Sequence, residues 1–329
     1  NTADGAILVA ATTGVRAQLN PQVPVVREFG IAPAGMADWI RAIRVHQWLK
    51  NILIFVPLLT AFSFGDMSRL AAAVMAFLSF SLIASATYIG NDLFDLESDR
   101  LHPRKRHRAF AAGRLSIAEG VVAAAALLTA GFVLATVVGA PFAAATLVYL
   151  LITVSYSWKL KRVVLLDALV LASLYTIRIV AGAAAIGVVT TSWLLAFSMF
   201  VFFSLALVKR CSELVSMREL GKNEARGRSY FVADLTVLWP LGVGAALAAI
   251  VVFGLFINSP DTLARYHSPT LLWLTAAGLL YWLSHLWLMT GRAKMHDDPL
   301  VFAVRDGHSR LALAFIVLST LGARYIQLG

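Results

Sequence analysis

Three aspartates at helical spacing are the side chains of this sequence best suited to chemistry. They stand in the stretch 91–100, which reads Asn-Asp-Leu-Phe-Asp-Leu-Glu-Ser-Asp-Arg. On a continuous helix Asp92, Asp95 and Asp99 lie within about 60° of one another. Carboxylates gathered in this way suit Mg²⁺, which takes its remaining ligands from water and from substrate phosphates. We therefore predict that these three residues bind a metal ion and act in catalysis; the alternative is a solvated helix end on which the acids align by chance.

A run of cations follows the aspartates, in the segment 102–108, His-Pro-Arg-Lys-Arg-His-Arg. It has two interpretations, an anchor that fixes membrane topology or a phosphate clamp beside the metal, since arginine offers bidentate geometry and lysine a point charge. In the second interpretation Lys105 and Arg108 are the expected ligands. Asn91 and Arg100, which flank the aspartates, are included in the same substrate-binding set.

Polar side chains also gather at the ends of two apolar runs. Gln47, Lys50 and Asn51 stand at positions i, i+3 and i+4, so on a helix they share one face. Tyr156 and Lys159 are three residues apart and would place a phenol and an ammonium group on one side of another helix. We predict that Lys50, Asn51, Tyr156 and Lys159 contact substrate.

Arg178 lies far inside an apolar run, 11 residues beyond Asp167, which is about 16 Å deeper along a helix. A guanidinium at that depth must face a cavity or a partner. It either forms an ion pair with a structural carboxylate or binds an anionic ligand. Asp167, Tyr175 and Arg178, together with Lys209 and Arg210 at the start of the next basic segment, complete the predicted substrate-binding set.

The segment 296–299, His-Asp-Asp-Pro, and the nearby Asp306 offer possible ligands for another metal ion. Aspartate before proline is also a turn signal and a good N-cap. We favour the second interpretation, a turn followed by the N-cap of the last helix.

The composition indicates where these groups must be held. Of the 329 residues, 59% are hydrophobic and 14% are charged, whereas a soluble domain has about 25% charged residues. This excludes an ordinary soluble enzyme, and the apolar content excludes a disordered chain. The single cysteine, Cys211, cannot form an intramolecular disulfide.

Nine apolar runs are long enough to cross the bilayer, since a helix needs about 20 residues to span the hydrocarbon core. They cover about 46–64, 69–90, 118–138, 140–158, 164–187, 192–208, 236–256, 269–290 and 307–325. Every backbone polar group in lipid needs an internal partner, so the predicted fold class is an all-α integral membrane protein, a bundle of nine transmembrane helices.

The loops between these runs alternate in charge. Those at 91–117, 159–163, 209–235 and 291–306 hold 18 of the 28 Lys and Arg residues, whereas the alternate loops hold only Arg69 and Arg265. The positive-inside rule then predicts a cytoplasmic N-terminus and an active site at the cytoplasmic side of the inner (plasma) membrane. A cytoplasmic tail, ordered or disordered, is the simplest account of residues 1–38, and 39–329 are expected to form the transmembrane domain. The net charge of +10 needs no nucleic-acid partner.

From about residue 40 to the end, the sequence resembles the UbiA superfamily of intramembrane prenyltransferases. The resemblance rests on Asn-Asp-x-x-Asp-x-x-x-Asp after the second span, then Arg-x-His-Pro-x-Lys and Gly-x-Leu-Ser. Members that use a prenyl diphosphate carry a second aspartate-rich motif after the sixth span; here 209–213 reads Lys-Arg-Cys-Ser-Glu. That segment, Arg-x-His-Gln-Trp-x-Lys-Asn at 44–51 and Tyr-x-x-Lys at 156–159 resemble one branch, the decaprenyl-phosphate phosphoribosyltransferases.

The resemblance implies a Mg²⁺-dependent glycosyltransferase. It would move 5-phosphoribosyl from 5-phosphoribosyl 1-diphosphate (PRPP) to decaprenyl or another polyprenyl phosphate, a step toward cell-wall arabinan (arabinogalactan). The expected partners are these substrates and membrane lipid, and a homo-oligomer is compatible with the resemblance. One alternative is a UbiA-type prenyltransferase with a prenyl diphosphate donor and an aromatic or other small acceptor. Another is an anion transporter or channel, which the scarcity of polar residues in the outer loops disfavours.

Overall fold

A computed structural model of the chain describes residues 4–9, 11, 13–29, 35–103, 105–221, 229–295 and 298–327. Two short strands, β1 (Ala6–Val9) and β2 (Val25–Phe29), pair in parallel around α1 (Thr13–Ala17). This small sheet lies in the segment that the sequence assigned to an N-terminal tail. All other regular structure in the described residues is helical.

The chain divides into two compact units. The first contains Asn1–Trp48 and Ser81–Phe132, and the second contains Leu49–Phe80 and Val133–Gly329. The helix α4 (Met67–Phe94) contributes residues to both. The first unit further contains α2 (Met36–Ala42), α5 (Leu96–Leu101), the 3₁₀ helix η2 (Lys105–His107) and most of α6 (Ile117–Val138).

The second unit holds the larger set of helices. Its α-helices are α3 (Val56–Thr60), α7 (Ala140–Trp158), α8 (Leu166–Ala185), α9 (Ser192–Glu219), α10 (Leu235–Ile257), α11 (Pro260–Arg265), α12 (Leu272–Gly291), α13 (Pro299–Arg305) and α14 (Gly307–Tyr325). It also contains three complete 3₁₀ helices, η3 (Leu160–Arg162), η4 (Val232–Asp234) and η5 (Pro269–Leu271), and the larger part of a fourth, η1 (Val45–Phe55).

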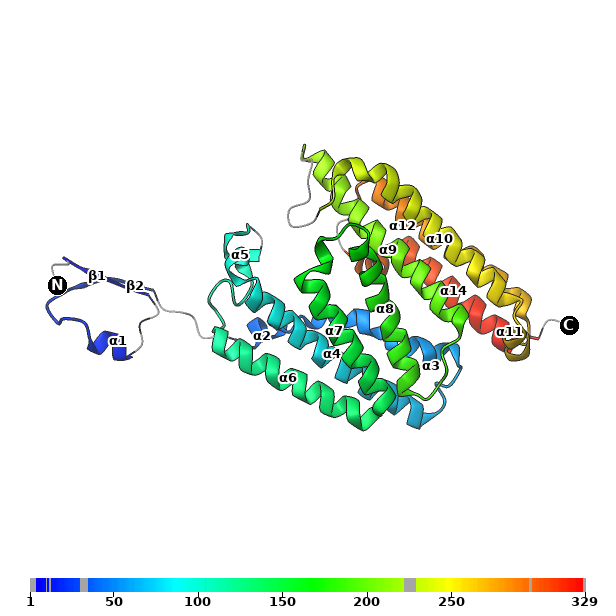
Figure 1. Ribbon diagram of the computed structural model, residues 1–329, viewed down its shortest axis with the longest axis horizontal. Helices are drawn as coiled ribbons and strands as arrows, with labels where there is room; N and C mark the ends of the chain where they lie inside the picture. The colour runs from blue at the N-terminus through cyan, green and yellow to red at the C-terminus, as the bar shows by residue number, and fades with distance from the viewer. Residues whose placement is uncertain are drawn as a thin grey trace. The chain divides into compact units, whose positions relative to one another are not determined.

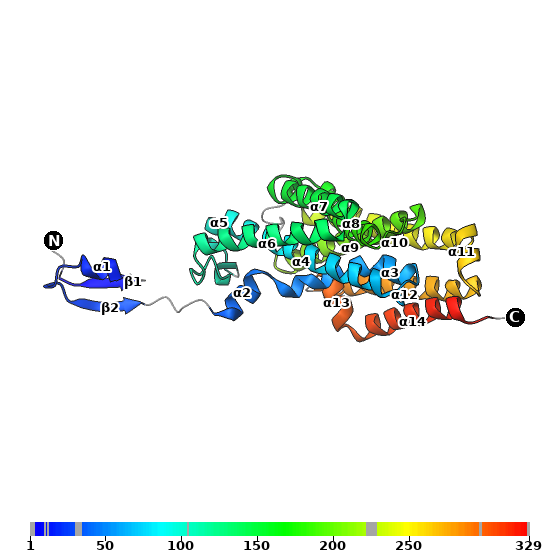
Figure 2. The same cartoon turned by 90° about the horizontal axis from the view of Figure 1, so that it is seen from below.

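Long helices of the second unit pack in sequence, α7 on α8, α8 on α9, α9 on α10 and α10 on α12 (Figure 1). The red α14 runs beside the orange α12 in both views (Figure 2). The core between α9, α10 and α12 is built from side chains such as Leu207, Leu238 and Leu286, which are at most 2% exposed.

The first unit has a smaller core, formed by buried side chains such as Ile89, Leu96, Phe110 and Leu115. Each of these is contributed by α4, α5 or the loop before α6, so the apolar side of the aspartate segment is fixed by packing. The core therefore holds the segment 92–99 in place from one side.

Seven of the described helical segments are long and apolar enough to cross a membrane. They are Met67–Phe94, Ile117–Val138, Ala140–Trp158, Leu166–Ala185, Ser192–Glu219, Val232–Ile257 and Pro269–Gly291. They correspond to the second to eighth predicted spans, and they make the chain an integral, multi-pass membrane protein. The ninth predicted span is a helix, α14, but it is not among these seven.

The first predicted span is not a single α-helix. It consists of η1, an unusually long 3₁₀ helix of 11 residues, followed by α3. Because a 3₁₀ helix rises about 2.0 Å per residue, η1 and α3 together still extend about 30 Å. Gly182 of α8 permits the close approach of η1, since a Cβ atom there would lie 2.1 Å from the carbonyl oxygen of Ile54.

The prediction of a loop at 209–235 is wrong for residues 209–219, because α9 continues to Glu219. The apolar run ends at residue 208, but the next ten residues contain no glycine or proline that would stop a helix. The helix ends only before Gly221, whose φ of 65° is the left-handed conformation typical of a helix C-terminus. Lys209 and Arg210 therefore stand on a rigid helix rather than in a loop.

Candidate active site

The predicted aspartate motif lies where α4 gives way to α5. The α-helix is interrupted at Asp95, which has φ −89° and ψ 10°. Its backbone hydrogen bonds nevertheless continue, since the Asp95 N–H donates to the Asn91 carbonyl (2.9 Å) and the Asp99 N–H donates to the Asp95 carbonyl (2.8 Å). The helical spacing of Asp92 and Asp99 is thus kept across the break.

Arg108 brings Asp92 and Asp99 together. Its Nη1 lies 3.1 Å from Asp92 Oδ1 and 2.6 Å from Asp99 Oδ2. Both carboxylates are buried, with side chains 6% and 1% exposed. Lys105 Nζ lies 3.5 Å from Asp99 Oδ1, so two of the predicted phosphate-binding cations contact the predicted metal ligands directly.

The geometry of Asp99 fits a divalent cation. Its Oδ1 is buried, and within the described residues no group donates a hydrogen bond to it. The cation nearest to this oxygen is the Lys105 ammonium at 3.5 Å, and a buried hard oxygen with free acceptor capacity is also the kind of ligand that Mg²⁺ takes. Because Arg108 Nη1 lies between Asp92 Oδ1 and Asp99 Oδ2, a metal ion shared by the two carboxylates would take the position of that guanidinium. Asp95 is half-buried and makes no ion pair in the described part of the chain.

Arg44 is a site residue that the sequence analysis missed. Its Nη2 lies 2.5 Å from Asp92 Oδ1, and its guanidinium stands 5.0 Å from the centre of the Tyr88 ring. Arg44 has a φ of 54°, a conformation that is strained for any residue other than glycine and that is often found at functional sites. The other two predicted residues of this region, Asn91 and Arg100, are half-buried and exposed, respectively.

In the second unit, Arg178 of α8 is buried, and all three nitrogens of its guanidinium donate hydrogen bonds. Its Nε donates to the amide oxygen of Asn51 (2.9 Å), one Nη donates to the Tyr149 hydroxyl (3.2 Å), and the other donates to the Leu174 carbonyl. Its guanidinium lies 4.9 to 5.6 Å from the ring centres of Phe80, Tyr149 and Tyr175.

The structural ion pair considered for Arg178 is not observed. Among the described residues no carboxylate lies within ion-pair distance of it, so its partners are neutral dipoles and aromatic faces. A buried guanidinium without an opposite charge favours the binding of an anion. The interpretation that Arg178 binds an anionic ligand therefore stays a prediction.

Lys50, Lys209 and Asp298 form a charged cluster within the second unit. Asp298 Oδ2 lies 2.9 Å from Lys50 Nζ and 3.6 Å from Lys209 Nζ, and the Tyr175 hydroxyl donates to it at 3.5 Å. Burial alone would raise the pKa of the Asp298 carboxyl, but the charges of the two lysines outweigh it and hold that pKa below its usual value. The two ammonium groups thus contact the same carboxylate oxygen.

The predicted N-cap of the last helix is confirmed for Asp306, whereas Asp298 caps α13, a short helix that was not predicted. The Asp298 carboxylate accepts the Leu300 N–H at the start of α13, and Asp306 accepts the Ser309 N–H at the start of α14. The predicted residues 296 and 297 lie outside the described part of the chain. The additional pairing of Asp298 with Lys50 and Lys209 was not predicted.

Arg210 forms a third cluster, in which every group is paired. Its Nε lies 2.6 Å from Asp167 Oδ2 and its Nη1 lies 2.8 Å from Glu213 Oε2, while Nη2 donates to the Tyr156 hydroxyl at 3.4 Å. The side chains of Arg210 and Asp167 are 1% and 0% exposed. The cluster links α7, α8 and α9.

Tyr230 completes this cluster and was also missed by the sequence analysis. Its hydroxyl donates to Asp167 Oδ1 and accepts the Leu165 N–H at 2.9 Å. Burial and the hydrogen bond to Asp167 raise the pKa of the Tyr230 hydroxyl above its usual value. Predicted residue Lys159, in contrast, is exposed at the end of α7.

A sequence model described as the UbiA prenyltransferase family matches residues 52–319. Among curated relatives, a protein of Sinorhizobium fredii called uncharacterized protein y4nM is 40% identical over 92% of this chain. This chain spans only 59% of that relative's length. The nodulation protein NoeC of Azorhizobium caulinodans is 36% identical over 88% of this chain and 94% of its own length.

A third relative is the decaprenyl-phosphate phosphoribosyltransferase of Mycolicibacterium smegmatis. It is 34% identical over 68% of this chain and 70% of its own length. Among solved structures, a UbiA homologue from Archaeoglobus fulgidus bound to GPP and Mg²⁺ aligns with a TM-score of 0.64 at 17% identity. The alignment covers 86% of this chain and 99% of that one, which shows a common fold.

Proposed function

The chain belongs to the UbiA prenyltransferase family, and from this premise we propose that it transfers a 5-phosphoribosyl group from PRPP to a polyprenyl phosphate such as decaprenyl phosphate, releasing diphosphate. The observation that carries the proposal is the buried Arg178, which has no carboxylate within ion-pair distance among the described residues. In the same unit, Lys50 and Lys209 both contact the carboxylate of Asp298.

The charge of the substrates explains this preference. PRPP carries a phosphate on one end and a diphosphate on the other, and the lipid acceptor carries a further phosphate. Fixed cations are the groups that recognise such anions, with arginine suited to bidentate contacts. A prenyl diphosphate with a neutral aromatic acceptor carries less charge and needs fewer cations.

The segment at the end of α9 supports the same choice. In the resemblance described above, prenyl diphosphate users carry a second aspartate-rich motif here. In this chain the segment 209–213 provides Lys209, and its one acid, Glu213, is paired with Arg210. The names of several relatives at 30 to 34% identity, decaprenyl-phosphate phosphoribosyltransferase, agree with this proposal.

The reaction needs no proton transfer. An ionised phosphate oxygen of the acceptor forms a bond to the anomeric carbon of the donor, and the bond from that carbon to the diphosphate oxygen breaks with its electron pair leaving on diphosphate. Attack opposite to the leaving group inverts the anomeric carbon. Since the nucleophile is already anionic, we assign no general base.

The residues of the chain act mainly by positioning and by electrostatic stabilisation. Asp92 and Asp99 would hold Mg²⁺, which supplies positive charge to the departing diphosphate. Within the first unit, Arg108 and Lys105 would bind anionic oxygens next to those carboxylates. Within the second unit, Arg178 and Lys50 would bind phosphate groups. Asp95 completes the proposed metal-binding motif.

We place the reaction at the cytoplasmic side of the inner membrane, because the basic loops predict that orientation and PRPP is soluble in water. The polyprenyl chain of the acceptor would remain in lipid beside the apolar helices. A second candidate, prenyl transfer from a prenyl diphosphate to a small acceptor, is favoured by the fold shared with the GPP-bound homologue.

An assay with the purified protein in detergent separates the two candidates. Radiolabelled PRPP, decaprenyl phosphate and Mg²⁺ should yield a labelled lipid, and labelled diphosphate release should depend on the acceptor. A parallel reaction with a prenyl diphosphate and a phenolic acid should give no product. Transfer only in the parallel reaction would reverse the assignment of donor and acceptor.

A further inference from the structure

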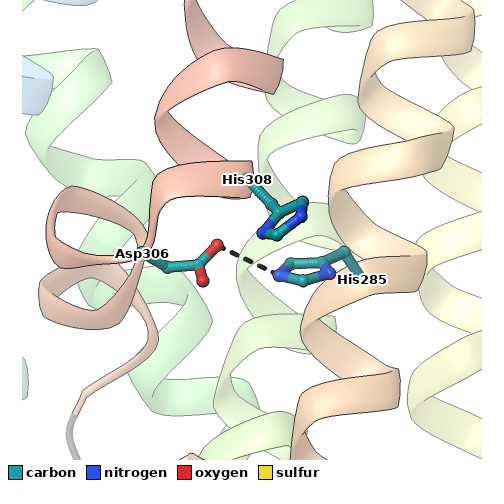
Figure 3. Close-up of side chains that lie close together, drawn as sticks. All are labelled: His285, Asp306 and His308. Carbon is teal, nitrogen blue, oxygen red and sulfur yellow. Dashed lines mark hydrogen bonds and ion pairs between the residues drawn. The ribbon is translucent and has the colours of Figure 1, made fainter.

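A cluster of two histidines and one aspartate lies in the second unit, apart from the residues assigned above. His285 belongs to α12, whereas Asp306 and His308 stand at the start of α14 (Figure 3). The candidate ligand atoms of all three residues lie within 4.8 Å of one another. The two histidines are 23 positions apart in sequence, so only the packing of α12 against α14 brings them together.

We propose that His285, Asp306 and His308 bind a divalent transition-metal ion of the zinc class, which joins α12 to the start of α14. Two imidazoles and a carboxylate are the ligand types of zinc sites with an open coordination position. Imidazole is a poor ligand for Mg²⁺, which prefers oxygen. The chemistry of this site thus differs from that of the carboxylates at Asp92 and Asp99.

Two of the three ligands are already oriented. His285 Nε2 lies 3.0 Å from Asp306 Oδ2, and the same oxygen accepts the Ser309 N–H at 2.7 Å, which fixes the carboxylate at the start of α14. The His285 ring stacks on Tyr281 at 6.0 Å with an angle of 11° between the planes. Partners that hold a ligand in this way improve metal affinity.

The third ligand can complete the site with little movement. The ring centres of His285 and His308 are 5.3 Å apart. In a tetrahedral site with metal–ligand bonds of about 2.0 to 2.1 Å, neighbouring ligand atoms lie about 3.3 Å apart. The candidate ligand atoms lie within 4.8 Å of one another, so they must approach by at most about 1.5 Å. His308 is exposed, and rotation of its ring supplies this movement without repacking the core.

The proposal is tested on the whole protein in detergent, freed of metal by a chelator and kept in excess Mg²⁺ so that oxygen-rich sites are occupied. Co²⁺ serves as the probe, because its visible absorption reports nitrogen ligation and low coordination number. We expect one equivalent of Co²⁺ to bind with such a spectrum and to be displaced by Zn²⁺. Zn²⁺ should also raise the thermal midpoint.

Two variants test the ligands, and a third serves as the control. His308→Ala should weaken Co²⁺ binding at least about tenfold, and Asp306→Asn should do the same while keeping an N-cap residue on α14. His267→Ala, which removes an exposed histidine outside the cluster, should bind as the unaltered protein does. Failure of the unaltered protein to bind Co²⁺ would overturn the proposal, as would His308→Ala and Asp306→Asn proteins that bind Co²⁺ as tightly as the unaltered protein.

Discussion

Asp99 of the first unit and Asp167 of the second are both buried carboxylates beside an arginine, yet their surroundings differ. Asp99 faces cations that are 32% and 42% exposed, and its Oδ1 receives no hydrogen bond from the described residues. Both oxygens of Asp167 accept hydrogen bonds, one from Arg210 and one from Tyr230, and Arg210 is 1% exposed. Both carboxylates are buried, but only Asp99 has an oxygen that accepts no hydrogen bond from the described residues.

The difference indicates two roles for buried acids in one protein. Arg108 and Lys105 reach Asp99 with side chains that are partly open to solvent, so they can turn outward when a metal ion replaces them beside the buried carboxylate. Breaking a buried pair leaves an uncompensated charge and is costly. We therefore interpret Asp99 as a carboxylate that exchanges its cation during the reaction. Asp167 and Arg210, although predicted to bind substrate, fit better as a fixed brace between helices.

Substitution of Asp99 should have the largest effect. We expect Asp99→Ala to lower turnover about 1,000-fold or more, because a ligand of the proposed metal ion and its charge are removed. The thermal midpoint should fall little, since the cations next to Asp99 can turn to solvent. The rate of lipid labelling from PRPP, measured beside a melting curve in detergent, tests this. Glu97→Ala, an exposed acid on the same helix, is the matched control, and near-normal turnover in Asp99→Ala would remove Asp99 from the mechanism.

Substitution of Asp167 should act on stability instead. We expect Asp167→Asn to lower the free energy of unfolding by about 3 kcal/mol, because Arg210 loses a fully buried partner. The double variant Asp167→Leu with Arg210→Met should recover part of that loss, since it leaves no buried charge unpaired. Denaturant unfolding in detergent measures both. A stable Asp167→Asn protein with a raised KM would show that Asp167 binds substrate, and the contrast with Asp99 would disappear.

Arg178 provides an intermediate case, a buried cation whose described partners are all uncharged. Arg178→Met should raise the KM for the donor or the acceptor about 10- to 100-fold, the effect expected from losing a charged contact to phosphate. Its thermal stability should be kept, because no carboxylate is left without a partner. Arg178→Lys, which retains the charge, should recover part of the affinity. An unchanged KM with a lower melting temperature would instead make Arg178 a structural residue.

The smallest effect is expected from the pH dependence of Asp298. Its pKa is depressed in the folded protein, so the stability it contributes is present above the unfolded pKa of about 3.9 and is lost as the pH falls through the lower, folded value. Asp298→Asn keeps an N-cap residue but removes this charge. The difference in thermal midpoint between the two proteins should therefore shrink below about pH 4. Parallel curves across that range would show that the lysine pairs contribute nothing measurable.

Local periodicity accounts for what could be predicted from the sequence. Asp92 and Asp99 are seven residues apart, and the backbone hydrogen bonds keep that spacing even where the α-helix is interrupted. The second to eighth predicted spans correspond to helices because about 20 apolar residues leave few other solutions in lipid. The basic segment 102–108 was correctly associated with the aspartates, since Lys105 and Arg108 contact Asp99.

Contacts between distant segments account for what was missed. Asp298 looked like a cap because its neighbours in sequence show only that, whereas Lys50 and Lys209 reach it from elsewhere in the second unit. The position of the Arg44 side chain depends on a positive φ angle, which the neighbouring residues in the sequence do not predict. Hydropathy also measures affinity for lipid rather than helix formation, so it could neither separate η1 from an α-helix nor follow α9 beyond residue 208.

The contact between Gly182 and Ile54 has a practical consequence for attempts to redesign this enzyme. The carbonyl oxygen of Ile54 occupies the volume that any side chain at position 182 would need. A saturation library that varies the lining around Arg178 should thus return only glycine at this position, whatever substrate is used for selection. A library designed to alter donor preference can therefore keep Gly182 and vary Asn51 and Tyr149, which accept hydrogen bonds from the Arg178 guanidinium.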